Sequence, residues 1–343
     1  MLTVAYIGFG NSVVRYHLPY VERRTDYINV KYIYRRAEDR ETAEEQERET
    51  WYPDITFTTD IDEVMTDEEV NLIVINSPDA FHVAYTMQAL EHGKNVLVEK
   101  PLALTSQEAK EVFAIAKEKG LLVMSNNNRR YDPDMRTLRQ VIESGVLGDL
   151  VELESHYDYY RPGMEHNKRM GLLFGLQIHP IDQIIGQFGI PNRVHYDCRS
   201  IDNPGLADDY TDIDFYYDNG FKVIVKTSFF VKIKYPKFIL HGKKGSFLVP
   251  DLGKISDEVH PPGPRVVSFD PYPEALAGTL SYIDDDGNEV NEKVPIVVGD
   301  YGIIYDNIRD VLAGKAEKII KDEETVAVLE IIEAGVEAAK EAK

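Results

Sequence analysis

Short apolar runs and longer polar stretches alternate along the first 125 residues of the chain. The apolar runs predict strands at 2–7, 28–34, 55–58, 71–76, 95–98 and 121–124. Helical patterns cover 37–50 and 80–92, and Thr105 or Ser106 begins a further helix that ends at Gly120. Strands that alternate with helices at this spacing predict a doubly wound parallel sheet.

The pattern changes near residue 125, and strands then dominate. Strands are expected at 150–160, 193–199, 212–217, 221–231, 235–241 and 246–249, with a hairpin turn at Asp218-Asn219-Gly220. Helices are expected at 132–144, 172–188, 303–312 and 323–342. These elements predict an α/β domain with a large, mainly antiparallel open sheet over 125–343, after a first domain over 1–124. The last helix is expected to pack back toward the first domain.

Composition narrows the class of protein. The chain has 343 residues, of which 43% are hydrophobic and 28% charged, and no apolar run has the roughly 18 residues that span a bilayer. A formal net charge of −21 disfavours nucleic acid and anionic membranes as partners. The start of the chain enters a strand pattern without a basic region, so no signal peptide is expected. A single cysteine, Cys198, excludes a disulfide framework, and we expect a cytoplasmic protein.

A glycine-rich turn directly follows the first predicted strand. In Gly8-Phe9-Gly10-Asn11-Ser12-Val13, the first glycine suits a tight turn and the second lets a pyrophosphate approach the backbone. The N–H groups of Asn11, Ser12 and Val13 then open a helix, where phosphates bind. Val13 stands where the usual pattern has a third glycine. The turn predicts dinucleotide binding, with a purely structural tight turn as the alternative.

The end of the second strand bears on which dinucleotide is bound. An NAD site places an acidic residue there to hold the ribose 2′-hydroxyl. This chain has Arg35 and Arg36 instead, and guanidinium groups bind a 2′-phosphate through paired hydrogen bonds. The sequence therefore favours NADP(H) over NAD(H), unless both arginines are simply surface charges.

The strand at 95–98 runs into Glu99-Lys100-Pro101, at the carboxyl end of a parallel strand where open α/β sheets bind ligands. With Gly8-Phe9-Gly10, Asn76-Ser77-Pro78 and His82, this string resembles the Gfo/Idh/MocA oxidoreductase family. The resemblance covers nearly the whole chain. It extends through Asn128-Arg129-Arg130-Tyr131 and Gly145-Val146-Leu147-Gly148 to Ile178-His179-Pro180-Ile181-Asp182. Arg15 to Pro19 and Tyr159 to Pro162 look most like the subgroup that includes NADP-dependent scyllo-inositol dehydrogenases.

The resemblance implies a Rossmann domain that binds a nicotinamide cofactor and a second domain whose sheet forms a dimer or tetramer. It implies a small polyhydroxylated substrate between the domains. By the same resemblance, the expected cofactor neighbours are His17, Ser77, Pro78, His82, Glu99, Lys100 and Asn128.

Lys100 is the first catalytic candidate. Oxidation of an alcohol needs a base at the hydroxyl while the carbon faces the nicotinamide. Lys100 serves as that base if neighbouring positive charge lowers its pKa, or it hydrogen-bonds the substrate oxygen and polarises a carbonyl in the reverse direction. Glu99 is expected to orient Lys100 or to contact the nicotinamide ribose. The alternative for Lys100 is an exposed lysine before a turn.

His179 is the second catalytic candidate. A lone histidine on a helix is usually structural, but the family motif that this segment resembles has a general base here. That motif also has an aspartate four residues earlier, where this chain has Gly175. The departure makes it unsafe to transfer the family's substrate preference to this chain.

Several polar residues are candidates for substrate binding. Asp158, Tyr160 and Arg161 end a long predicted strand, and Arg130 with Tyr131 follows the last strand of the first domain. Each is expected either to contact substrate hydroxyls or to serve the fold. The histidines are scattered, and no cluster has metal-ligand spacing.

The residues therefore predict an NADP(H)-dependent dehydrogenase or reductase acting on CH–OH groups of a sugar- or inositol-like substrate, with Lys100 and His179 in proton transfer or substrate polarisation. One alternative is a dinucleotide-binding regulatory or sensor protein without catalysis, which Gly175 favours. Another is an enzyme of the same fold acting on a different carbonyl or imine. The sequence leaves open the substrate, the direction, the oligomer number and which of Lys100 and His179 is the base.

Overall fold

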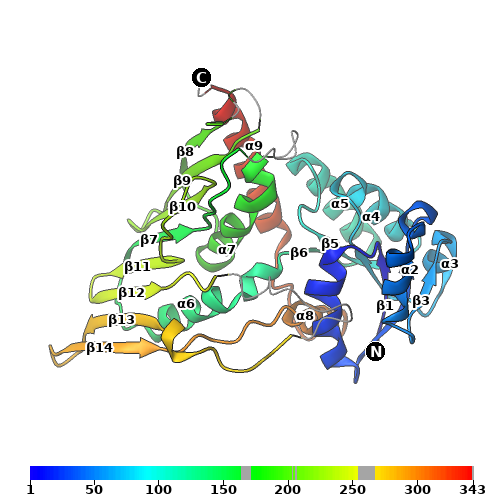
Figure 1. Ribbon diagram of the computed structural model, residues 1–343, viewed down its shortest axis with the longest axis horizontal. Coiled ribbons are helices and arrows are strands. Elements are labelled where there is room, and N and C mark those ends of the chain that lie inside the picture. The colour runs from blue at the N-terminus through cyan, green and yellow to red at the C-terminus, as the bar shows by residue number, and fades with distance from the viewer. Residues whose placement is uncertain (164–170, 203, 205–206, 254–266, 342–343) are drawn as a thin grey trace. The chain divides into compact units, whose positions relative to one another are not determined.

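The chain folds into two compact units, seen in a computed structural model that describes residues 1–163, 171–202, 204, 207–253 and 267–341 (Figure 1). The first unit takes Met1–Asn128 and, from much later in the chain, Asp300–Val326 together with Val267 and Ser268. The described residues between and after these segments form the second unit. The expected single boundary at residue 124 thus differs from the observed division, in which the chain returns to the first unit.

The first unit is built on a parallel sheet of six strands in the order β3-β2-β1-β4-β5-β6. This order reverses beside β1, as in dinucleotide-binding folds. β4 is buried at all four positions, which is typical of a parallel strand covered on both faces. The strands are β1 (Leu2–Ile7), β2 (Ile28–Tyr34), β3 (Thr56–Thr58), β4 (Leu72–Ile75), β5 (Asn95–Glu99) and β6 (Val123–Asn126).

Helices connect these strands, and their ends follow from local chemistry. α5 begins with a capping box in which Thr105 and Glu108 bond each other's backbone N–H groups, and it ends at Gly120 with φ of 66°. Its inner face, Ala109, Val112, Phe113 and Ala116, is buried as the spacing predicts. The helices before α6 are α1 (Leu18–Val21), α2 (Ala43–Thr50), α3 (Ile61–Thr66), α4 (His82–Glu91) and α5 (Ser106–Lys119).

A late helix, α8 (Ile303–Leu312), completes the first unit. Arg24, 9% exposed, binds Asp306 through Nε at 2.9 Å and Nη2 at 2.8 Å, and its Nη2 also lies 2.8 Å from Asp300. Removing one partner from a largely buried ion pair is costly because the other charge is left unpaired. Arg24 is thereby tied to residues 276 and 282 positions later in the chain.

The second unit contains an eight-stranded sheet in the order β14-β13-β12-β11-β7-β10-β9-β8. Among the strands that the structure describes, β7 and β10 are the one pair that runs parallel in this sheet, so it is mainly antiparallel as expected. The turn at Asp218-Asn219-Gly220 joins β9 to β10, with Gly220 at φ of 84°. The strands are β7 (Leu150–His156), β8 (Arg193–Arg199), β9 (Tyr210–Tyr216), β10 (Lys222–Ser228), β11 (Phe238–Gly242), β12 (Gly245–Val249), β13 (Gly278–Ile283) and β14 (Glu289–Val294).

Three helices supply the apolar residues that cover one face of this sheet: α6 (Pro133–Ser144), α7 (Ile178–Phe188) and α9 (Asp322–Glu341) (Figure 1). α9 begins in the first unit, but Ala327, Val328, Ile331 and Ile332 lie in the core of the second. Most of α9 thus belongs to the second unit, and only its first residues, up to Val326, belong to the first unit, toward which the last helix was expected to pack. The apolar stripe at these four positions explains the packing, and α8 is the helix that returns.

The fold class is confirmed, while some elements escape the sequence pattern. α3, β13 and β14 were not expected. No helix in the described part of the chain is both long and apolar enough to cross a membrane.

Candidate functional site

The glycine turn after β1 combines a tight backbone with an open space. Gly8 has φ of 104°, and a Cβ built on it would lie 2.7 Å from the carbonyl oxygen of Asn76. A side chain is therefore excluded at Gly8 by both conformation and contact. A Cβ on Gly10 would meet no atom within 4 Å. Gly10 thus keeps the approach to the backbone clear, as a phosphate site requires.

The helix after this turn begins at Asn11 and contains a π-helical turn, Val13–His17. Val13, in place of the usual third glycine, is fully buried, and Ser12 receives a hydrogen bond from the Asn76 amide at 3.2 Å. Because its side chain is buried, Val13 is accommodated within the core of the unit. π-helical turns are rare and often lie at functional sites.

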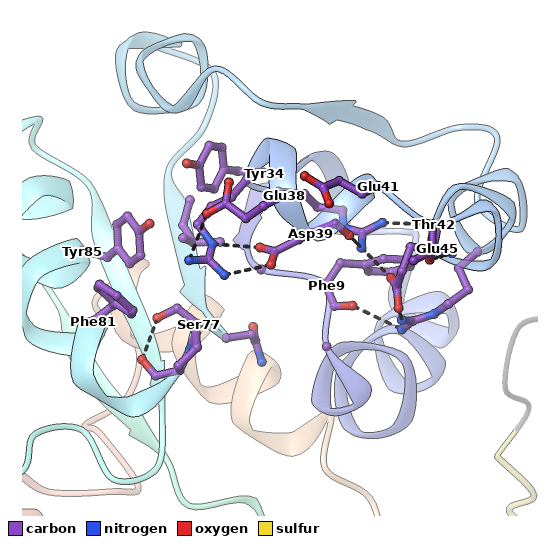
Figure 2. A pocket seen from close by; sticks show the side chains of 18 residues that line it. Phe9, Tyr34, Glu38, Asp39, Glu41, Thr42, Glu45, Ser77, Phe81 and Tyr85 are labelled. Atoms are coloured by element: carbon purple, nitrogen blue, oxygen red, sulfur yellow. Dashed lines mark hydrogen bonds and ion pairs between the residues drawn. The ribbon is translucent and has the colours of Figure 1, made fainter.

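A pocket of about 430 Å³ lies beside the glycine turn (Figure 2). Figure 2 shows Phe81 and Tyr85 on one side of it and Phe9 and Glu45 on the other. Among the expected cofactor residues, those that line the pocket are Gly8, Gly10, Arg35, Arg36, Ser77 and Pro78. The sequence reasoning missed the aromatic wall of Phe81 and Tyr85, and it missed Arg48 and the acidic residues Glu38, Asp39, Glu41 and Glu45.

Arg35 and Arg36 have different surroundings. Arg35 is 3% exposed, and its guanidinium binds Glu49 Oε1 at 2.8 Å and Glu45 Oε2 at 2.5 Å. It also lies over the Phe9 ring, 5.3 Å from the centroid. Arg35 lines the pocket, but its guanidinium is committed to carboxylates of α2, which could not be foreseen from the strand end alone.

The Arg36 side chain is 38% exposed. Its Nε and Nη2 atoms lie 2.9 and 2.8 Å from the two carboxylate oxygens of Asp39, and Nη1 lies 3.2 Å from Glu38. The hydrogen bonds from Arg36 lower the pKa of Asp39 although partial burial opposes them. Arg36 is the more accessible of the two guanidinium groups predicted to face a phosphate.

Glu99 ends β5 and lies within a polar cluster. Its Oε1 atom accepts hydrogen bonds from His17 Nε2 and from Asn126 Nδ2, each at 2.7 Å. The Lys100 N–H lies 3.3 Å from Oε2. Burial alone would raise the pKa of Glu99, but the hydrogen bonds and charges of its neighbours outweigh burial and lower it. Glu99 is thus held as a carboxylate next to Lys100.

His82 connects the strand ends that carry Ser77 and Lys100. Its Nδ1 atom lies 2.7 Å from the carbonyl oxygen of Pro101, and Nε2 lies 2.9 Å from that of Ser77. His82 is 1% exposed, at the first position of α4. Asn128, buried at 6%, opens a short 3₁₀ turn after β6. Neither His82 nor Asn128 lines the pocket, so His82 acts on the site through the backbone.

In the second unit, His179 is half-buried on α7. The centroid of its ring lies 6.2 Å from that of Tyr157. Gly175 is exposed in a π-helical turn, Leu173–Gln177, which precedes α7. Since a π turn is wider than an α turn, four residues of separation no longer align two side chains closely. The aspartate of the family motif is thus replaced by Gly175, and the helix geometry before His179 is π-helical rather than α-helical.

The expected substrate residues divide into buried and exposed ones. Arg130, 3% exposed, binds both carboxylate oxygens of Asp182 on α7, at 2.9 and 2.6 Å. Asp158 is buried beside His156, with 3.1 Å between Oδ2 and Nδ1. Arg130 therefore fixes the helix that carries His179, and its guanidinium serves the fold of this unit.

Tyr160 and Arg161 lie nearer the surface. Tyr160 is 51% exposed, with the Lys232 ammonium 4.6 Å from its ring centroid. The Arg161 guanidinium lies 4.5 Å from the ring centroid of Tyr159. Their side chains carry polar groups that solvent or a ligand reaches, in contrast to those of Arg130 and Asp158.

Comparison with known proteins agrees with this geometry. Residues 2–127 match the oxidoreductase family model with an NAD-binding Rossmann fold, and residues 135–248 match the GFO/IDH/MocA C-terminal domain. YhhX of Escherichia coli (strain K12), an uncharacterized oxidoreductase, is 43% identical over 99% of this chain and 97% of its own length. The chain belongs to the Gfo/Idh/MocA oxidoreductase family.

Other known proteins resemble the chain over nearly its whole length. The scyllo-inositol 2-dehydrogenase (NADP(+)) IolW of Bacillus subtilis (strain 168) is 27% identical over 99% of this chain and 94% of its own. A crystal structure of yhhX matches with a TM-score of 0.87 at 43% identity, covering 98% of this chain and 97% of that one. An oxidoreductase from Bacillus cereus gives 0.84 at 36% identity, covering 98% and 95%. The family resemblance expected from the sequence motifs is confirmed.

Proposed function

We propose that this protein is an NADP(H)-dependent dehydrogenase or reductase that transfers a hydride between the nicotinamide and a CH–OH carbon of a sugar- or inositol-like compound. The observation that carries the proposal is the open pocket at the Gly8–Gly10 turn, with the half-exposed Arg36 in its wall. The proposal rests further on Lys100, which directly follows β5, and β5 pairs with β4 in the same sheet.

The residues of this pocket fit a dinucleotide. The clear space above Gly10 suits a pyrophosphate, and Asn76 Oδ1 is buried without a hydrogen-bond partner among the described residues, leaving an acceptor for a ribose hydroxyl. Phe81 and Tyr85 offer aromatic surface for a purine. Arg36 supplies paired donors for a 2′-phosphate, although Asp39 competes for them.

NADP(H) would supply the acceptor or donor of the hydride, and the chain's own residues would handle the proton. Lys100 would hydrogen-bond the substrate oxygen and take its proton during oxidation, or return it during reduction. The charge of Lys100 is one of the causes that lower the pKa of the adjacent Glu99 carboxyl. His179 is the second proposed group for proton transfer, at the start of α7.

The substrate class rests on the relatives. IolW acts, by its name, on scyllo-inositol with NADP(+), and a protein 31% identical over 60% of this chain is an inositol 2-dehydrogenase. Tyr160 and Arg161 carry polar groups suited to hydroxyl-rich compounds. Gly175 stands where the family motif has an aspartate four residues before His179. We therefore propose a class of substrate and do not propose one particular inositol.

The enzyme proposal is tested by incubating the protein with NADP⁺ and a panel of inositols, aldoses and sugar acids while following NADPH absorbance. We expect turnover with at least one compound, and a loss of roughly 10²-fold or more in Lys100→Met. Lys119→Met, at an exposed position at the end of α5, is the matched control. Unchanged turnover in Lys100→Met would contradict its role. Tight NADPH binding with no turnover across the panel would favour a sensor protein instead.

We also propose self-association as a dimer or tetramer through the sheet face opposite α6, α7 and α9. Its outward residues on β8 to β10 form cation–aromatic pairs: Arg193 lies 3.9 Å from the Tyr216 ring centroid, and Arg199 lies 4.5 Å from that of Tyr210. Aromatic and arginine side chains are enriched at interfaces. Light scattering at micromolar protein is expected to give at least a dimer, and a monomer would contradict this part of the proposal.

A further inference from the structure

The acidic residue that the end of β2 lacks is supplied by the turn that comes after it. β2 ends at Tyr34, and Asp39 lies in the short 3₁₀ turn Ala37–Arg40 that follows. Asp39 lines the dinucleotide pocket, and so does Arg36 (Figure 2). A carboxylate therefore shares the pocket wall with the guanidinium that the sequence predicts to bind a 2′-phosphate.

Asp39 and Arg36 meet through paired contacts. Arg36 Nε lies 2.9 Å from Asp39 Oδ2, and Arg36 Nη2 lies 2.8 Å from Asp39 Oδ1. Two neighbouring N–H donors on two oxygens are also the geometry with which a guanidinium holds a phosphate. The third nitrogen of Arg36, Nη1, lies 3.2 Å from Glu38 Oε1. Asp39 thus occupies the donors that a 2′-phosphate would need.

The Arg36–Asp39 pair is open to solvent. The side chain of Arg36 is 38% exposed and that of Asp39 is 41% exposed. An ion pair this exposed contributes little to stability, because water screens its charges. A ligand can therefore replace either partner at a small cost, in contrast to the buried ion pairs of Arg35.

Of the two partners, Asp39 is the one that the fold holds in place. Its N–H donates to the Arg36 carbonyl oxygen at 3.1 Å, and its own carbonyl oxygen accepts a hydrogen bond from Arg35 Nη2. Arg35 is itself fixed, since it is buried and bound to Glu45 and Glu49. The long side chain of Arg36 has partners that are themselves exposed, so Arg36 is the member that reorients toward a ligand.

NAD(H) and NADP(H) differ at the ribose 2′ position, and the pair offers one group to each. A 2′-phosphate is negatively charged, so Arg36 attracts it and Asp39 repels it. A 2′-hydroxyl is neutral and donates a hydrogen bond, which a carboxylate accepts and a guanidinium cannot. The hydrogen bonds from Arg36 lower the pKa of Asp39, so this carboxyl is an ionised acceptor at neutral pH.

Building on the proposed function, we propose that Asp39 is a second cofactor-selecting residue, which accepts the ribose 2′-hydroxyl of NAD(H) and competes with the 2′-phosphate of NADP(H) for Arg36. The protein accordingly binds both dinucleotides. Its preference for NADP(H) is smaller than Arg36 alone would give, because the phosphate must first displace Asp39.

The test compares the dissociation constants of NADPH and NADH for the unmodified protein and for Asp39→Asn, by calorimetric titration at neutral pH and fixed ionic strength. Asparagine keeps the size of the side chain and removes its charge. We expect NADPH to bind roughly three- to tenfold more tightly, because Arg36 is released and a repulsion is removed. NADH should bind less tightly by a similar factor. The preference for NADPH over NADH should thus rise roughly ten- to a hundredfold.

Glu38→Gln is the matched control. Glu38 lines the same pocket, and its substitution changes the net charge equally. It meets Arg36 at 3.2 Å through one oxygen, and its side chain is 60% exposed. The preference of this variant is expected to change less than about threefold. An equal change in both variants would assign the effect to the overall charge of the pocket and overturn the inference, as would an unchanged preference in Asp39→Asn.

Binding is measured without turnover, so the inference and the proposed function fail separately. A preference that shifts as expected in a protein that oxidises no polyol supports the inference and contradicts the enzyme proposal. Turnover with NADP⁺, together with a preference that Asp39→Asn leaves unchanged, does the reverse. Because the pair is exposed, Asp39→Asn is expected to fold, and a thermal unfolding curve checks this.

Discussion

The Nδ1 atom of His82 lies 2.7 Å from the carbonyl oxygen of Pro101, so a side chain of α4 holds the turn that follows Lys100. Its other nitrogen, Nε2, lies 2.9 Å from the carbonyl oxygen of Ser77. One buried ring thus joins the wall of the dinucleotide pocket to the backbone beside the proposed catalytic lysine.

His82→Leu is expected to lower the free energy of unfolding by about 1–3 kcal/mol, because the carbonyl groups of Pro101 and Ser77 lose the ring nitrogens that lie within hydrogen-bond distance. NADPH affinity should fall as well, since Ser77 and Pro78 line the pocket. Urea unfolding and fluorescence titration measure the two effects. His92→Leu, at an exposed position just after α4, is the control and should change neither. Equal stability of the two variants would show that the bridge contributes nothing.

The two glycines of the turn should respond differently to alanine. Gly8→Ala is expected to destabilise the protein by more than about 1 kcal/mol, because φ of 104° and a Cβ 2.7 Å from the Asn76 carbonyl are both unfavourable. Gly10→Ala should leave stability nearly unchanged, since its Cβ meets no protein atom within 4 Å, but it should weaken NADPH binding. Thermal unfolding with a binding titration separates these effects. Full NADPH affinity in Gly10→Ala would place the phosphates elsewhere.

Arg36→Ala tests the preference for NADP(H). Loss of a paired, charge-assisted contact should weaken NADPH binding roughly ten- to a hundredfold while NADH binding changes little. Arg35→Met should instead destabilise the fold, because Glu45 and Glu49 lose their cationic partner. Calorimetric titration with both cofactors, beside an unfolding curve, gives the comparison. Parallel losses for NADPH and NADH in Arg36→Ala would argue against a 2′-phosphate site.

Asp208 predicts a pH dependence of stability. Burial raises the pKa of this carboxyl from 3.8 to about 6, although the Leu173 N–H bonds it at 2.9 Å. The folded chain therefore holds a proton that the unfolded chain has lost between about pH 4 and pH 6. This contribution, at most about 3 kcal/mol, is present below pH 4 and is lost as the pH rises through 6.

Asp208→Asn should accordingly unfold at higher urea than the unmodified protein at pH 8, and the two should converge near pH 4. The exposed Asp286→Asn serves as the control for charge removal. If Asp208→Asn shows the same stability difference at both pH values, the buried carboxyl does not titrate as described.

Local patterns were sufficient to predict elements whose apolar residues face a core. The observed bounds of β1, β2, β8 and α8 coincide with the expected ones. β14 escaped because it is largely polar and exposed at the end of the sheet, leaving little apolar periodicity. The six residues of α3 offer less than two turns of pattern. Such short or marginal elements are specified by their neighbours in space more than by their own sequence.

In the candidate site, too, some features could be predicted from local sequence and others depend on residues that are distant in the chain. The glycine turn and Glu99-Lys100-Pro101 could be recognised from their residue types and from their positions at or just after the end of a predicted strand. Whether the Arg35 guanidinium can bind a ligand depends on the carboxylates of α2 that pack against it, which the strand end does not reveal. Likewise, the contact of His17 with Tyr305 joins residues that are 288 positions apart in the chain. No local pattern encodes such pairings, so the residues that position the candidate catalytic groups emerged only from the three-dimensional structure.

The return of α8 to the first unit has a consequence for synthesis and engineering. During translation, the segment 1–128 leaves the ribosome long before Asp300, Tyr305 and Asp306, so Arg24 and His17 await partners that do not yet exist. We therefore expect the first unit to complete its contacts only after Asp300–Val326 have been made. A chimera that exchanges substrate domains between relatives must therefore take both 1–128 and 300–326 from one parent.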